Sequence, residues 1–328
     1  MVGGEQVDDC IVVGAGIAGL MAARTLHDAG LKVRVLEKGR GLGGRMASRR
    51  RDGATFDHGA QFFTVRDPRF EFWVEQWLRA GAAVPWYDLP KSGRHFRAAP
   101  GMTGIAKHVA QGLNVETQRK LNRVRHSTDR SPSWEVETAE HGSYHARALI
   151  LTPPVPQSLE LLDAGEFRLP PASRARLEEL RYHRCIAAMA ILDRPSAITD
   201  HSGALKLDGE PIQWIADNQR KGVSPDVPSV TIHSTPAFAE RHWDHENSER
   251  IPILLDAAAT HLGANVVSSD GHRWGFSQPI SAYGEEAFFD GQRNLAIAGD
   301  GLVGGRVEGA VLSGLAAAGA IRLALEQS

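Results

Sequence analysis

The sequence predicts an α/β fold in which a dinucleotide-binding domain with a parallel sheet is interleaved with a mainly antiparallel β domain. Three observations predict it. A β-branched strand, a glycine-rich turn and a helix open the chain at 10–29, and a strand, a glycine-rich turn and a helix close it at 294–325. Short strands separated by polar turns fill the region between them. The 328 residues suffice for one large or two modest domains.

The opening segment "CIVVGAGIAGLMAARTLHDAGLKVRVLEKG" predicts a βαβ unit of the Rossmann type. In its G-x-G-x-x-G pattern the first glycine makes the tight turn, the second lets the backbone approach a pyrophosphate, and the third permits close helix–strand packing. The helix N-terminus supplies N–H groups and a positive dipole end. Glu37 follows about 20 residues later, where an acid binds a ribose diol and disfavours a 2′-phosphate, so FAD or NAD is expected rather than NADP. The predicted contacts are Gly14, Gly16, Ile17, Ala18, Gly19 and Glu37.

A second glycine-rich turn, "KGRGLGGRM", follows the ribose-binding acid and contains Lys38, Gly44 and Arg45. A guanidinium fixed beside such a turn suits a cofactor with a second long arm. A flexible basic loop is the alternative, because Arg49, Arg50 and Arg51 follow and have the pattern of solvated residues.

The middle of the chain predicts two β regions. Residues 120–152 contain three short strands, and the last one is stopped by Pro153 and Pro154. From 155 to 277 the pattern is of antiparallel strands with one amphipathic helix at 248–263, capped by Ser248.

Three aromatic residues fall near the centres of these later strands: Trp214, His233 and Trp274. Ordinary core packing explains such residues as well as a ligand does, because an indole or imidazole is a common interior group with one polar handle. Both interpretations stay open on the residues alone.

Composition restricts the class of protein. The net charge is −2, so neither nucleic acid nor an anionic membrane is an expected partner. No secretory signal pattern opens the chain and two cysteines make no disulfide framework, which indicates a cytoplasmic protein. The apolar stretch 309–321 is too short to span a bilayer and predicts a small-residue helix packed against a sheet. His242, Asp244 and His245 lack a further ligand at metal-binding spacing, so no metal is expected.

Six segments, in chain order, resemble the renalase family, in particular its bacterial members, within the flavin amine oxidase superfamily. They are "EKGRGLGGRMASRR", "FDHGAQFFTVRD", "PGMTGIAKHVAQGL", "IQWIADNQRK", "HRWGFSQP" and "GDGLVGGRVEGAVLSG". The resemblance implies non-covalent FAD and a fold of the p-hydroxybenzoate hydroxylase type. It implies an FAD-binding domain at 1–66, 100–154 and 278–328, and a substrate domain at 67–99 and 155–277.

The resemblance also implies roles for individual residues. The backbone of Val124 is expected to contact the adenine, and Asp300 is expected near the ribityl chain or pyrophosphate. The N–H of Val307 is expected to face the flavin N1/O2 edge. A helix N-terminus at that edge stabilises the negative charge that hydride transfer brings. Further implied cofactor contacts are Lys38, Gly44, Arg45, Gln61, Phe62 and Thr152.

The substrate site is expected to depart from that of an amine oxidase. Such enzymes often have Tyr, one wall of an aromatic cage, where this chain has Arg306. A guanidinium repels a cationic amine and binds a carboxamide, carboxylate or phosphate. Gly301 replaces the bulky aromatic residue of bacterial relatives, which leaves the pocket shape open. The expected substrate contacts are Phe62, Phe63, Thr64, Val65, Arg66, Trp214, His233, Trp274, Gly301 and Arg306.

The family resemblance implies an oxidase that takes a hydride from dihydropyridine isomers of NAD(P)H and passes electrons to oxygen, giving NAD(P)+ and hydrogen peroxide. The product ring is aromatic, so no catalytic acid or base is required of the protein, which supplies orientation and charge stabilisation. The alternatives are a flavin amine oxidase, an aromatic monooxygenase and a non-enzymatic FAD-binding redox sensor.

Overall fold

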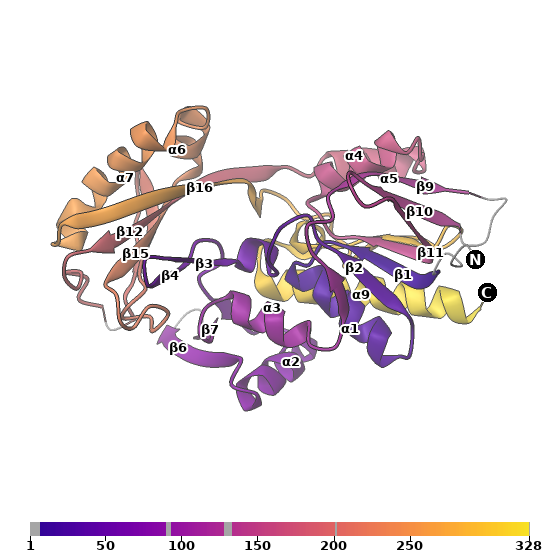
Figure 1. The fold of residues 1–328 in the computed structure, drawn as a ribbon, viewed down its shortest axis with the longest axis horizontal. Helices are drawn as coiled ribbons and strands as arrows, with labels where there is room; N and C mark the ends of the chain where they lie inside the picture. Colours follow the sequence, from indigo (N-terminus) through magenta and orange to yellow (C-terminus); the bar gives the residue numbers. More distant parts are fainter. Residues whose placement is uncertain (1–6, 90–92, 128–132, 201, 328) are drawn as a thin grey trace. The chain divides into compact units, whose positions relative to one another are not determined.

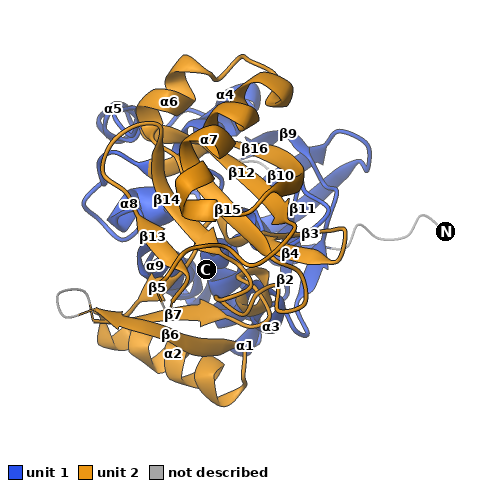
Figure 2. Cartoon of the chain, turned by 90° about the vertical axis from the view of Figure 1, so that its left-hand side faces the viewer, with its two compact units in different colours: residues 1–44, 106–181, 279–328 blue, residues 45–105, 182–278 orange. Residues whose placement is uncertain are grey.

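The structure is a computed structural model that describes residues 7–89, 93–127, 133–200 and 202–327. It has the predicted α/β class, and the chain divides into two compact units, each built from separate segments (Figure 2). Unit 1 contains Met1–Gly44, Ala106–Arg181 and Pro279–Ser328, and unit 2 contains Arg45–Ile105 and Tyr182–Gln278.

This division differs from the expected domain boundaries at three segments and at the single residue Gln278, which belongs to unit 2. Residues 45–66 and 100–105, expected with the FAD-binding domain, belong to unit 2. Residues 155–181, expected with the substrate domain, belong to unit 1. The reason for the last difference is packing: the helix α4 (Val155–Ala164) packs on the strand β9 (Leu121–His126), and α5 (Pro171–Glu178) packs on α4.

Unit 1 is built on an eight-stranded sheet with the order β17-β18-β11-β1-β2-β8, extended by β10 and β9 from β11. The pairs β1–β2, β1–β11, β11–β18 and β2–β8 are parallel, whereas β9–β10 and β10–β11 are antiparallel. The three strands predicted between 120 and 152 are therefore confirmed, although part of their first turn, 128–132, lies outside the described residues. Besides β9, the strands are β1 (Asp8–Val13), β2 (Val33–Leu36), β8 (Asn114–Glu116), β10 (Trp134–Thr138), β11 (Ser143–Leu151), β17 (Phe288–Asp290) and β18 (Leu295–Ile297).

Two helices of unit 1, α1 (Ile17–Asp28) and α9 (Val307–Glu326), pack against each other (Figure 1). A Cβ on Gly314 of α9 would lie 2.2 Å from the carbonyl oxygen of Ala18 in α1, so only glycine permits this approach. At 20 residues α9 is longer than the predicted apolar stretch, and by length and composition alone it could cross a membrane. Its packing against α1, with 56% of the apolar window buried inside the protein, is what a core helix shows.

Unit 2 contains three sheets. They have the orders β13-β14-β15-β12-β16, β5-β7-β6 and β3-β4, and the predicted antiparallel pairing is confirmed for β13–β14, β14–β15 and β12–β15. Their strands are β3 (Ser48–Arg51), β4 (Ala54–Asp57), β5 (Phe63–Thr64), β6 (Ala83–Leu89), β7 (Gly93–Ala98), β12 (Tyr182–Leu192), β13 (Ala204–Lys206), β14 (Ile212–Asp217), β15 (Ser229–Ser234) and β16 (Val266–Pro279). The helices of the two units not yet named are the 3₁₀-helix η1 (Gly44–Met46) and the α-helices α2 (Pro68–Arg79), α3 (Thr103–Val109), α6 (Pro236–Arg241), α7 (Asn247–Leu262) and α8 (Asp300–Val303).

The helix α7 covers the five-stranded sheet and begins one residue earlier than predicted. Its N-cap is Glu246, which forms a capping box with Glu249. The expected cap, Ser248, is instead the second residue of the helix. Two reciprocal bonds satisfy two N–H groups at once, which a single serine hydroxyl does not do.

Two β-bulges in unit 2 each involve a tryptophan. In β6 the register with β7 shifts between Pro85 and Tyr87, so Trp86 is the extra residue. In β14 the register with β15 shifts between Ile212 and Trp214, which leaves Trp214 opposite His233. A bulge re-aims side chains and is common beside functional sites.

Candidate functional site: a glycine-rich turn and an aromatic cluster

The glycine-rich turn after β1 has the geometry of a dinucleotide-binding turn. Gly14 has φ +99°, which favours glycine. A Cβ on Gly19 would lie 2.0 Å from the carbonyl oxygen of Gly14, so this residue permits α1 to start close to the strand. A Cβ on Gly16 would meet no atom within 4 Å, which means that the space beside this residue is open to a ligand. The second glycine turn lies alongside: Gly43 N–H donates to the Ala15 carbonyl at 2.8 Å.

Glu37 lies at the end of β2, where its carboxylate joins these two turns. Oε2 accepts from the Ala15 N–H at 2.7 Å and Oε1 from the Gly39 N–H at 2.6 Å. Each carboxylate oxygen retains a further acceptor site. Glu37 is therefore held in place by the backbone while it can still accept from a ribose diol.

Three further predicted cofactor residues of unit 1, Thr152, Val124 and Lys38, have mainly structural contacts. Thr152 donates its hydroxyl to the Val13 carbonyl at 2.7 Å and so ties β11 to the end of β1. Val124 is fully buried in β9, and its carbonyl lies against Gly165, where a Cβ would approach to 1.7 Å. The exposed Lys38 donates to Gln157 at 3.2 Å.

The C-terminal stretch forms a strand, the short helix α8 and the start of α9. Asp300 opens α8 and is 8% exposed, and the buried Gly301 accepts from the Tyr283 N–H at 3.1 Å through its carbonyl. Val307 is the first residue of α9, and the exposed Arg306 is its N-cap, whose side chain makes no capping hydrogen bond. The N-terminal end of this 20-residue helix carries the positive end of the helix dipole, which suits an anionic ligand group.

These observations fit the adenine-nucleotide part of FAD in unit 1. The open space at Gly16, the fixed carboxylate of Glu37 and the N-terminal end of α1 match what a pyrophosphate and a ribose require. When bound, FAD supplies a hydride acceptor. Gly14, Gly16, Ile17, Ala18, Gly19, Glu37 and Gly44, with Asp300 and Val307, are the residues of unit 1 that would hold it.

Two predicted cofactor residues, Arg45 and Gln61, belong to unit 2 and have partners there. Arg45 donates to the Phe276 carbonyl at 3.3 Å. The Gln61 side chain donates to the carbonyls of Asp57 and Gly59 and accepts from Lys221 at 3.0 Å, so both ends of its amide are engaged.

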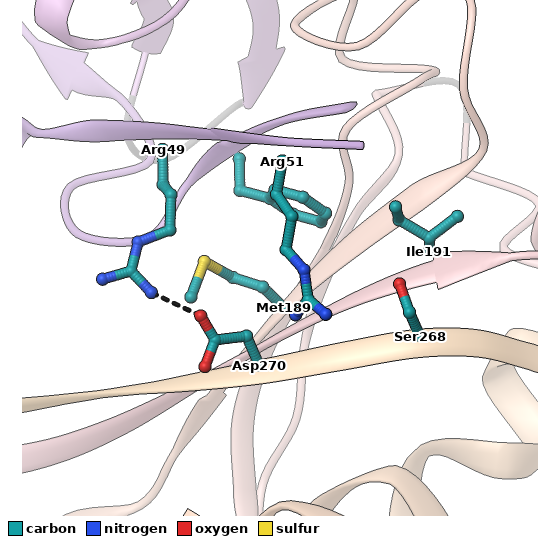
Figure 3. Close-up of a pocket in the computed structure, with 7 residues that line it drawn as sticks. Arg49, Arg51, Met189, Ile191, Ser268 and Asp270 are labelled. Carbon is teal, nitrogen blue, oxygen red and sulfur yellow. Dashed lines mark hydrogen bonds and ion pairs between the residues drawn. The ribbon is translucent and has the colours of Figure 1, made fainter. Parts of the chain in front are cut away.

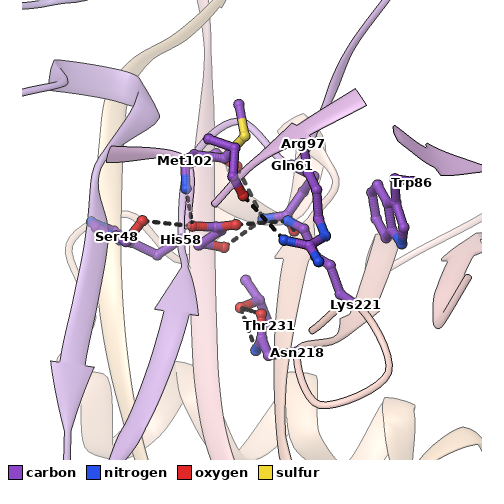
Figure 4. A network of polar contacts seen from close by, with 12 residues as sticks. Ser48, His58, Gln61, Trp86, Arg97, Met102, Asn218, Lys221 and Thr231 are labelled. Carbon is purple, nitrogen blue, oxygen red and sulfur yellow. Dashed lines mark hydrogen bonds and ion pairs between the residues drawn. The ribbon is translucent and has the colours of Figure 1, made fainter. Parts of the chain in front are cut away.

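The centre of this network is a buried ion pair that the sequence analysis missed (Figure 4). Lys221 donates to Asp57 Oδ2 at 2.8 Å, and both side chains are 0% exposed. The other carboxylate oxygen accepts from Ser48 at 2.6 Å and from the Met102 N–H at 2.8 Å. Burial lowers the pKa of the Lys221 ammonium, and the charge of Asp57 opposes that shift. The two residues lie in the quoted motifs "FDHGAQFFTVRD" and "IQWIADNQRK", but no spacing rule indicates that the motifs meet.

An aromatic cluster, defined as Phe62, Trp86, Tyr87, His95 and Trp214, lies over this network. The ring centroid of Phe62 is 4.7 Å from His95, 5.6 Å from Trp214 and 6.3 Å from Trp86. The Lys221 ammonium lies 4.8 Å from the Trp86 ring centroid. Trp86, the extra residue of the β6 bulge, and Trp214, which follows the β14 bulge, thus contact one phenylalanine. Among the described residues, the buried Trp214 Nε1–H has no hydrogen-bond acceptor.

His233 and Trp274 converge on one carbonyl group. His233 Nε2 and Trp274 Nε1 lie 3.2 Å and 2.8 Å from the carbonyl oxygen of His58, and both donate because a carbonyl only accepts. Burial lowers the pKa of His233 to about 4. Burial, with smaller effects of the charges on His272, Arg49 and His233, lowers the pKa of His58 to about 3. Both imidazoles are therefore neutral near pH 7.

The segment 62–66 does not act as one substrate-facing wall, which corrects the expectation for Phe63. Neighbouring residues of an extended chain point to opposite sides. Phe62 joins the aromatic cluster, whereas Phe63 is 3% exposed and stacks on Phe96 at 5.6 Å in the core. Thr64 is buried in β5 as well. Val65 and Arg66 line an open cavity of about 580 Å³, whose other lining residues are Glu71, Asp88, Gly93, Arg94 and Phe96.

In the basic run 49–51, Arg49 and Arg51 make specific contacts, whereas Arg50 is exposed as a solvated residue would be. Arg49 forms an ion pair with Asp270 at 2.6 Å (Figure 3), and Arg51 donates to the Ser269 carbonyl at 2.8 Å. Both arginines line a small pocket with Phe56, Met189, Ile191, Ser268 and Asp270. Its charges are matched within the protein, so it offers no unpaired group to a ligand.

Known families match almost the whole chain. Residues 12–76 match the NAD(P)-binding Rossmann-like domain, and residues 78–322 match the flavin containing amine oxidoreductase family. A putrescine oxidase of Kocuria rosea is 54% identical over 92 residues, which cover 26% of this chain and 19% of the relative. A carotenoid 3,4-desaturase of Haloarcula japonica is 39% identical over 92 residues, 27% of this chain and 18% of the relative. These matches thus span less than a fifth of each relative's length.

Solved structures share the fold over the full chain. A putative protoporphyrinogen oxidase from Exiguobacterium sp. superposes with a TM-score of 0.74 at 15% identity, covering 99% of this chain and 100% of that one. Cyclohexylamine oxidase from Brevibacterium oxydans gives a TM-score of 0.74 at 16% identity, covering 98% and 100%. Likeness at this identity concerns the fold alone, whereas the family match covers residues 78–322, well over half of the chain. The chain therefore belongs to the flavin containing amine oxidoreductase family and is an FAD-dependent oxidoreductase.

Proposed function

We propose that this protein is an oxidase of the renalase type, which takes a hydride from 2- or 6-dihydro isomers of NAD(P)H and uses oxygen as electron acceptor. The balanced reaction is NAD(P)H isomer plus oxygen plus a proton, giving NAD(P)+ and hydrogen peroxide. In this proposal unit 1 holds FAD, and the aromatic cluster of unit 2 holds the nicotinamide ring.

The observation that carries the proposal is the buried Trp214 Nε1–H, which has no acceptor among the described residues. An unsatisfied buried donor costs free energy that a ligand carbonyl removes. The nicotinamide carboxamide supplies such an oxygen on a flat ring that can stack with Phe62. An alkyl ammonium group has only donors and cannot satisfy Trp214.

The charges near the cluster support the same substrate class. The neutral His58 and His233 carry no negative charge, and the buried Asp57 is already paired with Lys221. A cationic amine therefore finds no unpaired carboxylate among these groups, whereas a neutral amide or an anionic nucleotide is compatible with them.

An amine oxidase is the second candidate, favoured by the 54% identity to putrescine oxidase over 92 residues. Anaerobic stopped-flow mixing of the FAD-loaded protein with borohydride-reduced NAD+, which contains the isomers, distinguishes the two. We expect loss of the flavin absorbance with the isomers and none with putrescine or cyclohexylamine. Bleaching by an amine, with no response to the isomers, overturns the proposal in favour of the amine oxidase.

The variants Trp214→Phe and Arg306→Ala refine the test. Trp214→Phe removes one hydrogen bond to the carboxamide. The second-order rate constant for flavin reduction by the isomers should therefore fall about 10-fold. Arg306→Ala should weaken substrate capture more than FAD retention. An Arg306→Ala protein that loses FAD but keeps substrate affinity contradicts the substrate-facing role of this residue.

A further inference from the structure

Unit 2 carries a second cation beside the Asp57–Lys221 pair. Arg97 lies in β7 two residues after His95, so both side chains leave the same face of the strand. His95 contacts Phe62, with ring centroids 4.7 Å apart. Arg97 therefore leaves β7 on the side of the aromatic cluster, and its charge acts on Lys221, whose ammonium lies 4.8 Å from the Trp86 ring centroid.

Arg97 and Lys221 share a single carboxylate. The charge of Asp57 acts on both cations, but its direct bond, at 2.8 Å, is to Lys221. Within the described residues Arg97 forms no ion pair, and its Nη1 donates to the Ala98 carbonyl at 3.2 Å. Two cations against one carboxylate leave one positive charge uncompensated in this partly buried group. Such a charge is costly unless a ligand pairs with it.

The turn that carries Lys221 lies close to the guanidinium of Arg97. Gly222 has φ +76°, and a Cβ on this residue would lie 2.8 Å from Arg97 Nη2. The backbone can approach the guanidinium this closely because residue 222 has no side chain. A guanidinium carries its N–H groups in a planar fork, which suits paired N–H bonds to an anion.

We propose that Arg97 is an anion-binding residue that takes the phosphate of a nicotinamide nucleotide whose ring binds the aromatic cluster. Arginine binds phosphate and carboxylate oxygens through two parallel N–H bonds. Lys221 contributes positive potential nearby, while two of its three N–H groups are used by Asp57 and Gln61. This inference rests on the proposed function, since it takes the nicotinamide ring as the neighbouring group.

Calorimetric titration of the FAD-loaded protein tests the site without turnover. The probes are nicotinamide mononucleotide, which has the phosphate, nicotinamide riboside, which lacks it, and nicotinate, which has a ring carboxylate. We expect the wild type to bind the mononucleotide at least about 10-fold more tightly than the riboside. Arg97→Gln should abolish that ratio and leave riboside affinity within about 2-fold. The control is Arg94→Gln, which lies three residues earlier and so on the opposite face of β7, and it should change neither affinity.

The outcomes separate this site from the proposed reaction. Equal affinities of the wild type for mononucleotide and riboside, or an unchanged ratio in Arg97→Gln, overturn the phosphate site. A loss confined to nicotinate also overturns it, because Arg97 then reads a ring carboxylate. If Arg97→Gln does not fold, Arg97→Lys is the test variant. The proposal predicts that Arg97→Lys loses affinity for the mononucleotide, and an unchanged affinity contradicts it. If the isomers fail to reduce the flavin while the ratio depends on Arg97, the proposed reaction fails and the anion site stands.

Discussion

Lys221 and Asp57 form an ion pair that is 0% exposed at both side chains and joins residues 164 positions apart in the chain. The pair connects the turn after β14 to the end of β4. Its remaining polar atoms are bonded as well, to Gln61, Ser48 and the Met102 N–H. Removal of either partner leaves a buried charge without compensation.

We therefore predict that Lys221→Met and Asp57→Asn each lower the free energy of unfolding by about 3–5 kcal/mol. The double variant should lose clearly less than the sum of the two, because no unpaired charge then remains. Urea unfolding at equilibrium measures all three values. Lys206→Met, at an exposed position of the same unit, is the control and should change stability by less than about 0.5 kcal/mol. Additive losses in the double variant contradict a coupled pair.

The glycines of the first turn should separate cofactor binding from folding. Gly16→Ala adds a methyl group that meets no protein atom within 4 Å, so the apoprotein should keep its melting temperature. FAD affinity should nevertheless fall at least about 10-fold, because the methyl group occupies the space where the backbone approaches the pyrophosphate.

Gly19→Ala provides the contrast, since its methyl group would lie 2.0 Å from the Gly14 carbonyl. This variant should lower the melting temperature of the apoprotein itself. Thermal unfolding of both apoproteins and fluorescence titration with FAD measure the difference. If Gly16→Ala binds FAD as the wild type does, the pyrophosphate does not lie at this turn.

The contact between α1 and α9 supplies a second matched pair of glycines. Gly314→Ala places a methyl group 2.2 Å from the Ala18 carbonyl, whereas Gly319→Ala, in the same helix, meets no atom within 4 Å. We expect Gly314→Ala to destabilise by about 1–3 kcal/mol through overpacking. Gly319→Ala should stabilise by up to about 1 kcal/mol, because alanine has the higher helix propensity. Equal effects of the two substitutions on urea unfolding contradict the close approach of the helices.

The parts of the fold that could be predicted from sequence are those in which local pattern and chemistry agree. The strand, glycine turn and helix at the start of the chain meet these conditions, since Gly14, Gly19 and Glu37 each have a defined local task. Strands from β9 to β15 could also be predicted, because period-2 patterns and turn residues mark them.

The cluster in unit 2 could not be predicted, because it depends on long-range pairing and on irregular strands. Trp86 and Trp214 reach Phe62 through bulges, and a bulge has no clear signal in a single sequence. In the sequence, Lys221 has the pattern of a solvated turn residue. Only the three-dimensional structure shows that its turn lies against Asp57. The prediction for Phe63 is wrong for the opposite reason: the family motif suggests a substrate contact, whereas strand alternation turns the side chain into the core.

The two neutral histidines give the last prediction, a loss of stability in mild acid. His58 is 5% exposed and its pKa is lowered to about 3, while that of the partly buried His233 is lowered to about 4, from an ordinary value of 6.5. Between about pH 6.5 and 4 the unfolded chain binds a proton at each site and the folded protein does not. The free energy of unfolding therefore falls as the pH decreases through this window, by up to about 1.4 kcal/mol per pH unit for each histidine.

Urea unfolding at about pH 7, 6 and 5 measures this slope for the wild type and for His58→Gln. The variant loses the ring contacts of His58 and is expected to be less stable at every pH, so absolute stability does not test the prediction. The test is the change in the free energy of unfolding per pH unit. In His58→Gln this slope should be smaller by the contribution of one histidine. In His141→Gln, at an exposed position, it should equal the wild-type slope. The groups acting on His58 besides burial are His272, Arg49, His233 and Asp57, and Asp57 alone favours its protonation. An unchanged slope in His58→Gln means that this imidazole is not held neutral, and the charge balance argued for the aromatic cluster then fails with it.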